Sequence, residues 1–175
     1  MKMTNSITGI AITVGVMALA GCNGNTDPQP SVGSSSSAIQ NVSCSINSDY
    51  LIDPEDKRQV AGVSGNVLIG KVAEKTGEKT DGAASRTTFR VDNLRNMKGD
   101  LAPSVTIYQT GTAACPNADV PLLEAGQYYV LALDSVGPPQ KLIKAYATTQ
   151  DAAETAARDL NQAGGVIREV VQAVS

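Results

Sequence analysis

Apolar and polar positions alternate along the middle of the chain, in five stretches separated by polar turns. A period of two places successive side chains on opposite faces, which is typical of half-buried β-strands. The pattern predicts strands at 67–75, 86–94, 104–110, 128–134 and 141–147. Alternate residues on four of these strands are expected to share one core: Val67, Ile69, Phe89, Val91, Val105, Ile107, Tyr129, Leu131 and Leu133. Ala132 is expected to point away from that core and to tolerate a polar substitution.

The pattern changes to helical spacing at both ends of the strand region. Asp53 and Pro54 have the chemistry of a helix start, as an N-cap and a first-turn proline, and predict a short helix to about Ala61. Residues 148–175 are rich in Ala and form a predicted C-terminal helical segment, which Gly164-Gly165 divides into two pieces. This segment either covers one end of the sheet or binds a partner.

The N-terminus has the three-part build of an export signal. Lys2 precedes an uncharged run at 7–20, which is shorter than the roughly 20 residues of a spanning helix. The run ends in Leu19-Ala20-Gly21-Cys22. This motif resembles the lipobox of bacterial lipoproteins, and the resemblance implies a diacylglycerol on Cys22 and cleavage before it. The alternative is an ordinary secretory signal followed by a coincidental cysteine.

The domain organisation follows from this motif and from composition. Residues 1–21 are the predicted lipoprotein signal peptide, and 22–43 are the lipidated Cys22 and a flexible tether of Asn, Gly, Pro and Ser. Such a tether spans roughly 25 Å. Residues 44–147 are the predicted β-domain, and 148–175 the helical segment. We expect the protein on the extracytoplasmic side of a cell membrane, held by acyl chains such as palmitate.

The chain has three cysteines, and lipid on Cys22 would leave Cys44 and Cys115. Exported proteins keep disulfides, so these two are predicted to form a disulfide bond. Closing this long loop stabilises a fold by roughly 4 kcal/mol in the chain-entropy description. Two free thiols are the alternative.

Composition narrows the function classes. All seventeen acidic residues and all but one of the fourteen basic residues follow Cys22, so the mature chain has a net charge of −4. A mildly acidic chain without a basic stripe is not expected to bind nucleic acid. The chain has no His, which removes the usual general base and the commonest zinc ligand. We therefore predict no catalytic residues, no metal site and no cofactor.

Four short motifs suggest a fold family. They are Gly70-Lys71-Val72, Met97-Lys98-Gly99, Val105-Thr106-Ile107 and the stretch from Leu123 to Leu133. Together they resemble the netrin-like and TIMP-like OB domains. The resemblance implies a mainly β fold, a small five-stranded OB-like antiparallel barrel with a C-terminal helical segment. Inhibitors of the TIMP type chelate the zinc of a protease through a free N-terminal Cys. Here Cys22 is predicted to be lipidated and Cys44 is internal, so inhibition by that route is not expected.

Three function classes remain. The first is a non-catalytic binding or accessory module of the cell envelope, anchored to the membrane through Cys22, with a protein or an envelope polymer as partner. The second is an envelope enzyme that uses the loop carboxylates Glu74, Glu78 and Asp81, or a protease-inhibitor-like module of the TIMP/netrin type. The third is a Ca²⁺-binding protein in which Glu78 and Asp81 supply ligands, although no EF-hand spacing is present.

Overall fold

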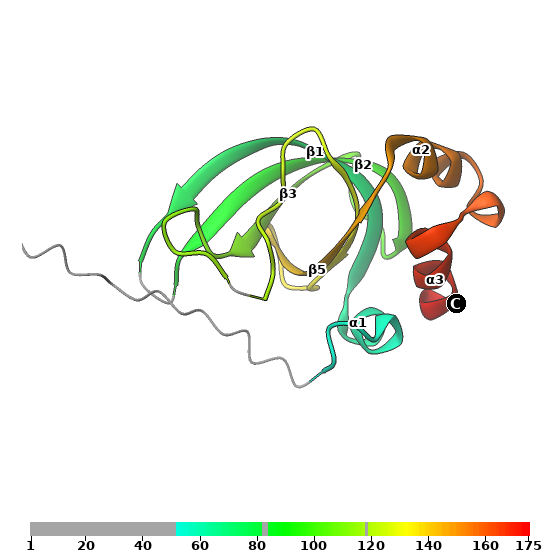
Figure 1. The fold of residues 1–175 in the computed structure, drawn as a ribbon, viewed down its shortest axis with the longest axis horizontal. Helices are drawn as coiled ribbons and strands as arrows, with labels where there is room; N and C mark the ends of the chain where they lie inside the picture. Colours follow the sequence, from blue (N-terminus) through cyan, green and yellow to red (C-terminus); the bar gives the residue numbers. More distant parts are fainter. Residues whose placement is uncertain (1–51, 82–83, 118) are drawn as a thin grey trace, which may run out of the picture. The chain divides into compact units, whose positions relative to one another are not determined.

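Five strands form a mixed β-sheet, in a computed structural model that describes residues 52–81, 84–117 and 119–175 (Figure 1). The strands are β1 Asn66–Lys79, β2 Arg86–Lys98, β3 Ser104–Thr110, β4 Tyr128–Leu133 and β5 Gln140–Thr148. Neighbouring strands follow the order β1-β2-β3-β5-β4, and β4 also pairs with β1, so the hydrogen bonds form a ring.

The pairing is antiparallel except between β3 and β5, which are parallel through Ile107 with Gln140 and Tyr108 with Lys141. The expectation of a wholly antiparallel sheet is therefore wrong. The reason is that the ring has five strands, and an odd number of strands cannot alternate in direction all the way around a ring. One parallel pair is required, and it falls where β5 meets β3.

All five predicted strands are present, and β3 has the expected bounds. The two longest strands, β1 and β2, continue beyond the prediction and pair with each other as far as Lys79 with Arg86. The stretch from Thr76 to Lys79, expected in a loop, therefore belongs to β1. Two register shifts, between Val72 and Glu74 and between Lys75 and Gly77, disturb the alternation there, because each bulge adds an unpaired residue.

The inside of the ring holds the main core. Its buried residues are Leu68, Val72, Phe89, Val91, Val105, Ile107, Leu123, Leu131, Leu133 and Leu142, and Tyr129 packs against them partly buried. Most of the predicted core is thus confirmed, but the assignment of Val67 and Ile69 to it is wrong. They face the other side of the sheet, where they pack with Val130 under the C-terminal helices. Register shifts on either side of Leu68 and Ile69 accompany this change of face.

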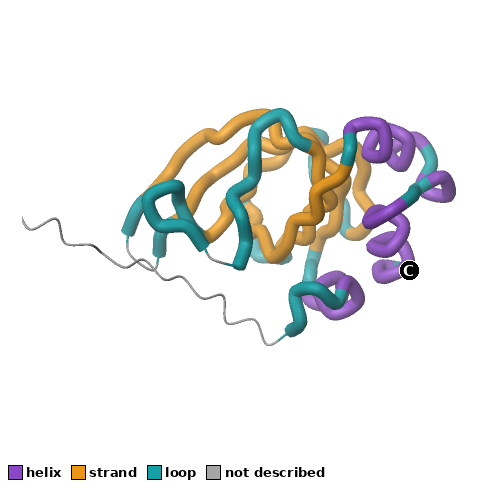
Figure 2. The backbone as a smooth tube through the Cα atoms, viewed as in Figure 1, coloured by secondary structure: helices purple, strands orange, loops and turns teal. Residues whose placement is uncertain are grey.

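The C-terminal segment consists of α2 Gln150–Arg158, a 3-10 turn at Leu160–Gln162 and α3 Gly165–Val174 (Figure 2). Thr149 caps α2 by accepting a hydrogen bond from the backbone of Ala152 at 3.3 Å. Buried residues of this segment form a second cluster on the outer side of the sheet: Ala153, Ala156, Ala163, Ile167 and Val170. The predicted helical segment is confirmed, and it contains two helices that cover the sheet, but the break begins at Asp159, and Gly164-Gly165 instead begins α3.

The first helix, α1 Lys57–Val63, begins later than expected. Its N-cap is Asp56, which accepts hydrogen bonds from the backbone of Arg58 at 2.9 Å and of Gln59 at 3.3 Å. Asp53 is not the cap, because its carboxylate instead closes a turn with the backbone N–H of Glu55.

A third, small cluster forms where α1 meets the sheet. Val60 of α1 packs with Ala132 and Ile143. Ala132 does point away from the main core, as expected. It is nevertheless buried, because α1 covers this part of the outer side of the sheet.

Candidate functional site

A polar surface lies on the outer side of β2, β3 and β5, around Tyr108; Arg86 and Thr106 are exposed there, and the other residues are half-buried. Tyr108 pairs with Thr88 of β2 on one side and with Lys141 of β5 on the other. Its sequence neighbours on β3 are buried, so alternation directs its ring outward. The Arg86 guanidinium lies 5.8 Å from the centroid of this ring. We call these residues the Tyr108 surface: Arg86, Thr88, Thr106, Tyr108, Thr110 and Lys141.

The two cations of the Tyr108 surface differ from most others on the domain. Five cations form salt bridges with carboxylates: Lys57, Lys75, Lys79, Arg90 and Lys144. Backbone carbonyls accept hydrogen bonds from Arg95, Lys98, Arg158 and Arg168. Arg86 and Lys141 form no salt bridge with another residue that the structure describes. The surface therefore carries two positive charges that the described part of the fold does not neutralise.

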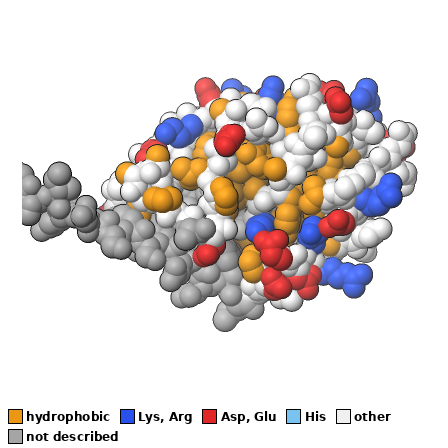
Figure 3. Space-filling view, in the orientation of Figure 1, with side chains coloured by type: hydrophobic (Ala, Val, Ile, Leu, Met, Phe, Trp, Pro, Cys, Tyr) orange, Lys and Arg blue, Asp and Glu red, His pale blue; other side chains and the backbone are white. Residues whose placement is uncertain are grey.

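A group of three charged side chains with a net charge of −1 lies next to this surface, on β1 and β2. The Arg90 guanidinium hydrogen-bonds to Glu74 Oε1 and to Asp92 Oδ1, both at 3.0 Å. The hydrogen bond to Glu74 raises the pKa of Arg90 further above its ordinary value, so Arg90 stays charged. Figure 3 shows blue and red side chains interspersed on the face in view, with no continuous basic stripe. Among the described residues, Arg58 and Lys71 likewise form no salt bridge, so Arg86 and Lys141 are distinguished by their positions on either side of Tyr108.

The loop carboxylates proposed for catalysis or Ca²⁺ binding are separately paired. Glu74 bonds to Arg90, Glu78 to Lys75 at 2.9 Å, and Asp81 to Lys79 at 3.2 Å. Each carboxylate thus has its own cation, and the structure does not bring the three together. Within 52–81, 84–117 and 119–175, no group of three acidic or cysteine side chains is placed to hold a metal ion.

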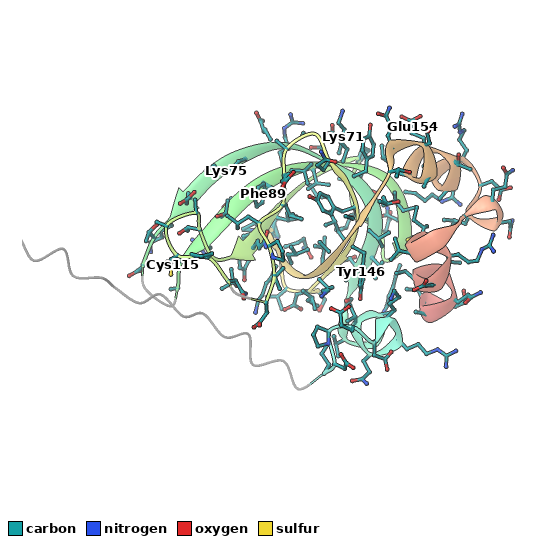
Figure 4. The ribbon with its side chains drawn as sticks, in the orientation of Figure 1. Lys71, Lys75, Phe89, Cys115, Tyr146 and Glu154 are labelled. Carbon is teal, nitrogen blue, oxygen red and sulfur yellow. The ribbon has the colours of Figure 1, made fainter. Side chains whose placement is uncertain are left out.

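A shallow cleft of about 270 Å³ lies between the outer side of β2 and α2. Leu94 and Ala157 supply apolar walls, and Glu154 and Arg158 supply one charge of each sign. Figure 4 shows Glu154 on α2, at the same edge of the domain as Lys71. The cleft is smaller than the roughly 300–1,000 Å³ of small-molecule pockets, and its opposite charges select no ligand class.

Tyr146 of β5 fastens α1 to the domain (Figure 4). Its hydroxyl donates to the carbonyl of Pro54 at 3.4 Å, and the Lys57 ammonium lies 5.4 Å from the ring centroid. Lys57 also bonds to Glu169 of α3 at 3.0 Å. Burial, followed by the nearby carboxylates of Glu55, Asp56 and Asp53, raises the pKa of Tyr146 to about 12. Tyr146 is therefore a neutral structural group rather than a general base.

Cys115 is buried in the loop that follows β3, at the end of the domain away from α2 and α3 (Figure 4). The backbone N–H of Cys115 donates to Thr112 Oγ1 at 3.0 Å, which closes a tight turn. The buried Gln109 holds the next part of this loop. Its amide donates to the carbonyl of Pro121 at 2.7 Å and accepts from the backbone N–H of Leu123 at 3.0 Å. The loop that carries Cys115 is thus ordered by buried polar side chains.

The other two predicted site residues, Cys22 and Cys44, lie outside the described residues. The lipid attachment and the disulfide bond therefore stay predictions. In the part of the chain that the structure describes, no helix is long and apolar enough to cross a membrane.

Comparison with known proteins adds no identity, since no protein family and no curated protein matches the chain. The chemistry of the candidate surface therefore decides which ligands it suits.

The sequence pattern assigned Arg86 and Tyr108 to strands but did not indicate that the two side chains lie close together. That proximity depends on the cross-strand register, which pairs Tyr108 with Thr88 and Arg86 with Thr110.

Proposed function

We propose that this protein is a lipid-anchored lipoprotein of the cell envelope, whose extracytoplasmic domain is a non-catalytic binding or accessory module. One observation carries the proposal: the stretch Leu19-Ala20-Gly21-Cys22 follows an uncharged run that is too short to span a bilayer. Acyl chains on Cys22 would hold the protein at the membrane, because each buried methylene contributes roughly 0.8 kcal/mol. The residues up to the folded domain would then serve as the tether.

The same proposal includes an OB-like barrel as the finer description of the fold. Five strands in a closed ring of hydrogen bonds, with the order β1-β2-β3-β5-β4, support it. The motif resemblance to netrin-like and TIMP-like domains agrees with this. Fold alone does not determine activity, so the function must be argued from surfaces.

Binding is favoured over catalysis by the available side chains. The chain has no His, and the loop acids Glu74, Glu78 and Asp81 are held in separate, exposed ion pairs. Catalytic carboxylates work beside a second functional group at the substrate, whereas each of these three acids pairs with its own cation on the surface. The Tyr108 surface is the best candidate for contact with a partner, because its cations are uncompensated.

The experiment is metabolic labelling with a fatty acid in cells that export the protein, followed by detergent phase partitioning. The parent chain should incorporate label and enter the detergent phase. Cys22→Ser should lose both properties, and Ser36→Ala in the predicted tether should keep both. Undiminished labelling of the Cys22→Ser chain would show that lipid is attached elsewhere and would refute the anchor.

A further inference from the structure

We propose that the Tyr108 surface binds an acidic polysaccharide, with sugar carboxylates held by Arg86 and Lys141. This inference rests on the proposed function, because an extracytoplasmic module meets such polymers. It adds a ligand class and the residues that recognise it.

The positions of the two positive charges suit a polymer that carries several carboxylates. Arg86 is on β2 and Lys141 on β5, with Tyr108 of β3 between them. Their backbones lie two strand spacings apart across the sheet and two residues apart along it, because Arg86 pairs with Thr110 and Lys141 with Tyr108, so the separation is about 12 Å. The long side chains of Arg86 and Lys141 can shorten or lengthen this separation at their charged ends, and a polyuronic acid carries a carboxylate on every sugar. One polymer could therefore place a carboxylate at each cation without a change in the fold.

The aromatic ring fixes the geometry of one of these contacts. The Arg86 guanidinium rests 5.8 Å from the Tyr108 centroid, which limits the orientations of its planar fork. A fork held in one orientation loses less side-chain entropy when it binds a carboxylate in a bidentate manner. The exposed part of the Tyr108 ring offers an apolar contact to the C–H groups of a sugar.

The remaining side chains favour a sugar over a protein partner. Thr88, Thr106 and Thr110 surround the ring with hydroxyls that both donate and accept hydrogen bonds, as sugar hydroxyls do. A protein interface would need an apolar centre. The exposed large apolar residues that the structure describes are Val63, Leu94 and Val136, and none belongs to the Tyr108 surface.

Nucleic acid fits this surface less well. A single-stranded chain binds by stacking successive bases on several aromatic rings inside a positively charged groove. The Tyr108 surface has one ring, and the neighbouring Arg90 is already paired with Glu74 and Asp92.

The test is fluorescence anisotropy with labelled polygalacturonate and the full chain in detergent micelles. Neutral dextran and single-stranded poly(dT) are the comparison probes. Arg86→Gln and Lys141→Gln should each raise the Kd for polygalacturonate about two- to fivefold, the range of exposed ion pairs. The double variant should raise it more than either. Arg58→Gln removes one exposed charge from α1 and is the matched control, with an unchanged Kd. Circular dichroism verifies the fold of each variant.

Salt should weaken the binding of the parent chain, since exposed charges are screened. The proposal is overturned if folded parent protein does not bind polygalacturonate, or if Arg58→Gln weakens binding as much as Arg86→Gln. It is also overturned if poly(dT) binds more tightly and shows the same dependence on Arg86 and Lys141. None of these measurements requires lipid on Cys22, so failure here is separable from failure of the membrane anchor.

Discussion

Truncation of Leu131 is the sharpest test of the core. Leu131 lies on β4 between Leu68 of β1 and Ala145 of β5, and its exposed fraction is 0%. Leu131→Ala removes three carbon groups, a transfer loss of roughly 2.4 kcal/mol at about 0.8 kcal/mol each. The closed ring of strands limits relaxation into the cavity, which adds to the loss. We therefore expect a decrease of about 3–4 kcal/mol in the free energy of unfolding, within the range of roughly 2–5 for buried Leu truncations.

Thermal unfolding of the full chain, followed by circular dichroism, measures this loss. For a domain of this size, 1 kcal/mol shifts Tm by about 4 °C, so Leu131→Ala should melt about 10–15 °C earlier. Val136→Ala is the matched control. Val136 lies between β4 and β5 with an exposed fraction of 74%, so its truncation should change Tm little.

Two outcomes would contradict this description of the core. If Leu131→Ala melts within 2 °C or so of the parent, Leu131 does not fill the inside of the ring. If Val136→Ala loses as much stability as Leu131→Ala, burial does not determine the cost of truncation in this domain, and the assignment of the inner face fails.

Three further predictions follow from other parts of the domain. Ala132→Ser should destabilise the contact between α1 and the sheet, because a hydroxyl would be buried against Val60; faster hydrogen exchange confined to α1 would show this, and unchanged exchange would refute it. Peptide mapping without reduction should recover Cys44 linked to Cys115, whereas two alkylatable thiols in the folded protein would disprove the bond. The pKa of Tyr146 is about 12, above the ordinary 10, so the fold favours the neutral phenol. The contribution of this phenol to the free energy of unfolding is therefore present below pH 10 and is lost as the pH rises toward 12. Ultraviolet titration should show one tyrosine ionising near pH 12 that Tyr146→Phe removes; an unchanged curve would contradict this assignment.

Strand β3 was predictable because β-branched and polar residues alternate in it without interruption. In β3, Val105 and Ile107 alternate with Thr106 and Tyr108, and both bounds were correct. The same alternation also indicates an inward Gln109, whose role in holding the loop around Pro121 was missed. A buried amide has no signal in the sequence beyond its position.

The errors arose where local pattern and long-range contact disagree. Val67 and Ile69 alternate correctly, but bulges in β1 place Leu68 inside the ring instead. Ala132 was assigned to the correct side of β4, yet its burial depends on α1, which precedes β1 in the chain. The alternation of residues along one strand does not indicate which distant element packs against it.

The candidate surface was the least predictable part of the molecule. Arg86, Tyr108 and Lys141 come from three strands, and only the parallel pairing of β3 with β5 brings Lys141 beside Tyr108. The sequence-based expectation was antiparallel throughout, so this juxtaposition could not have been derived from it. By contrast, the lipid-anchor motif is local, and its four consecutive residues can be recognised without any structure.

The most direct test of the account is intact-mass spectrometry of the mature protein isolated from membranes, with fragmentation of its N-terminal peptide. We expect a chain that lacks residues 1–21 and begins at Cys22, with a mass increase on Cys22 that corresponds to diacylglycerol. A mature chain that begins at another residue, or an unmodified Cys22, would contradict the central claim that this domain is held at the membrane by lipid.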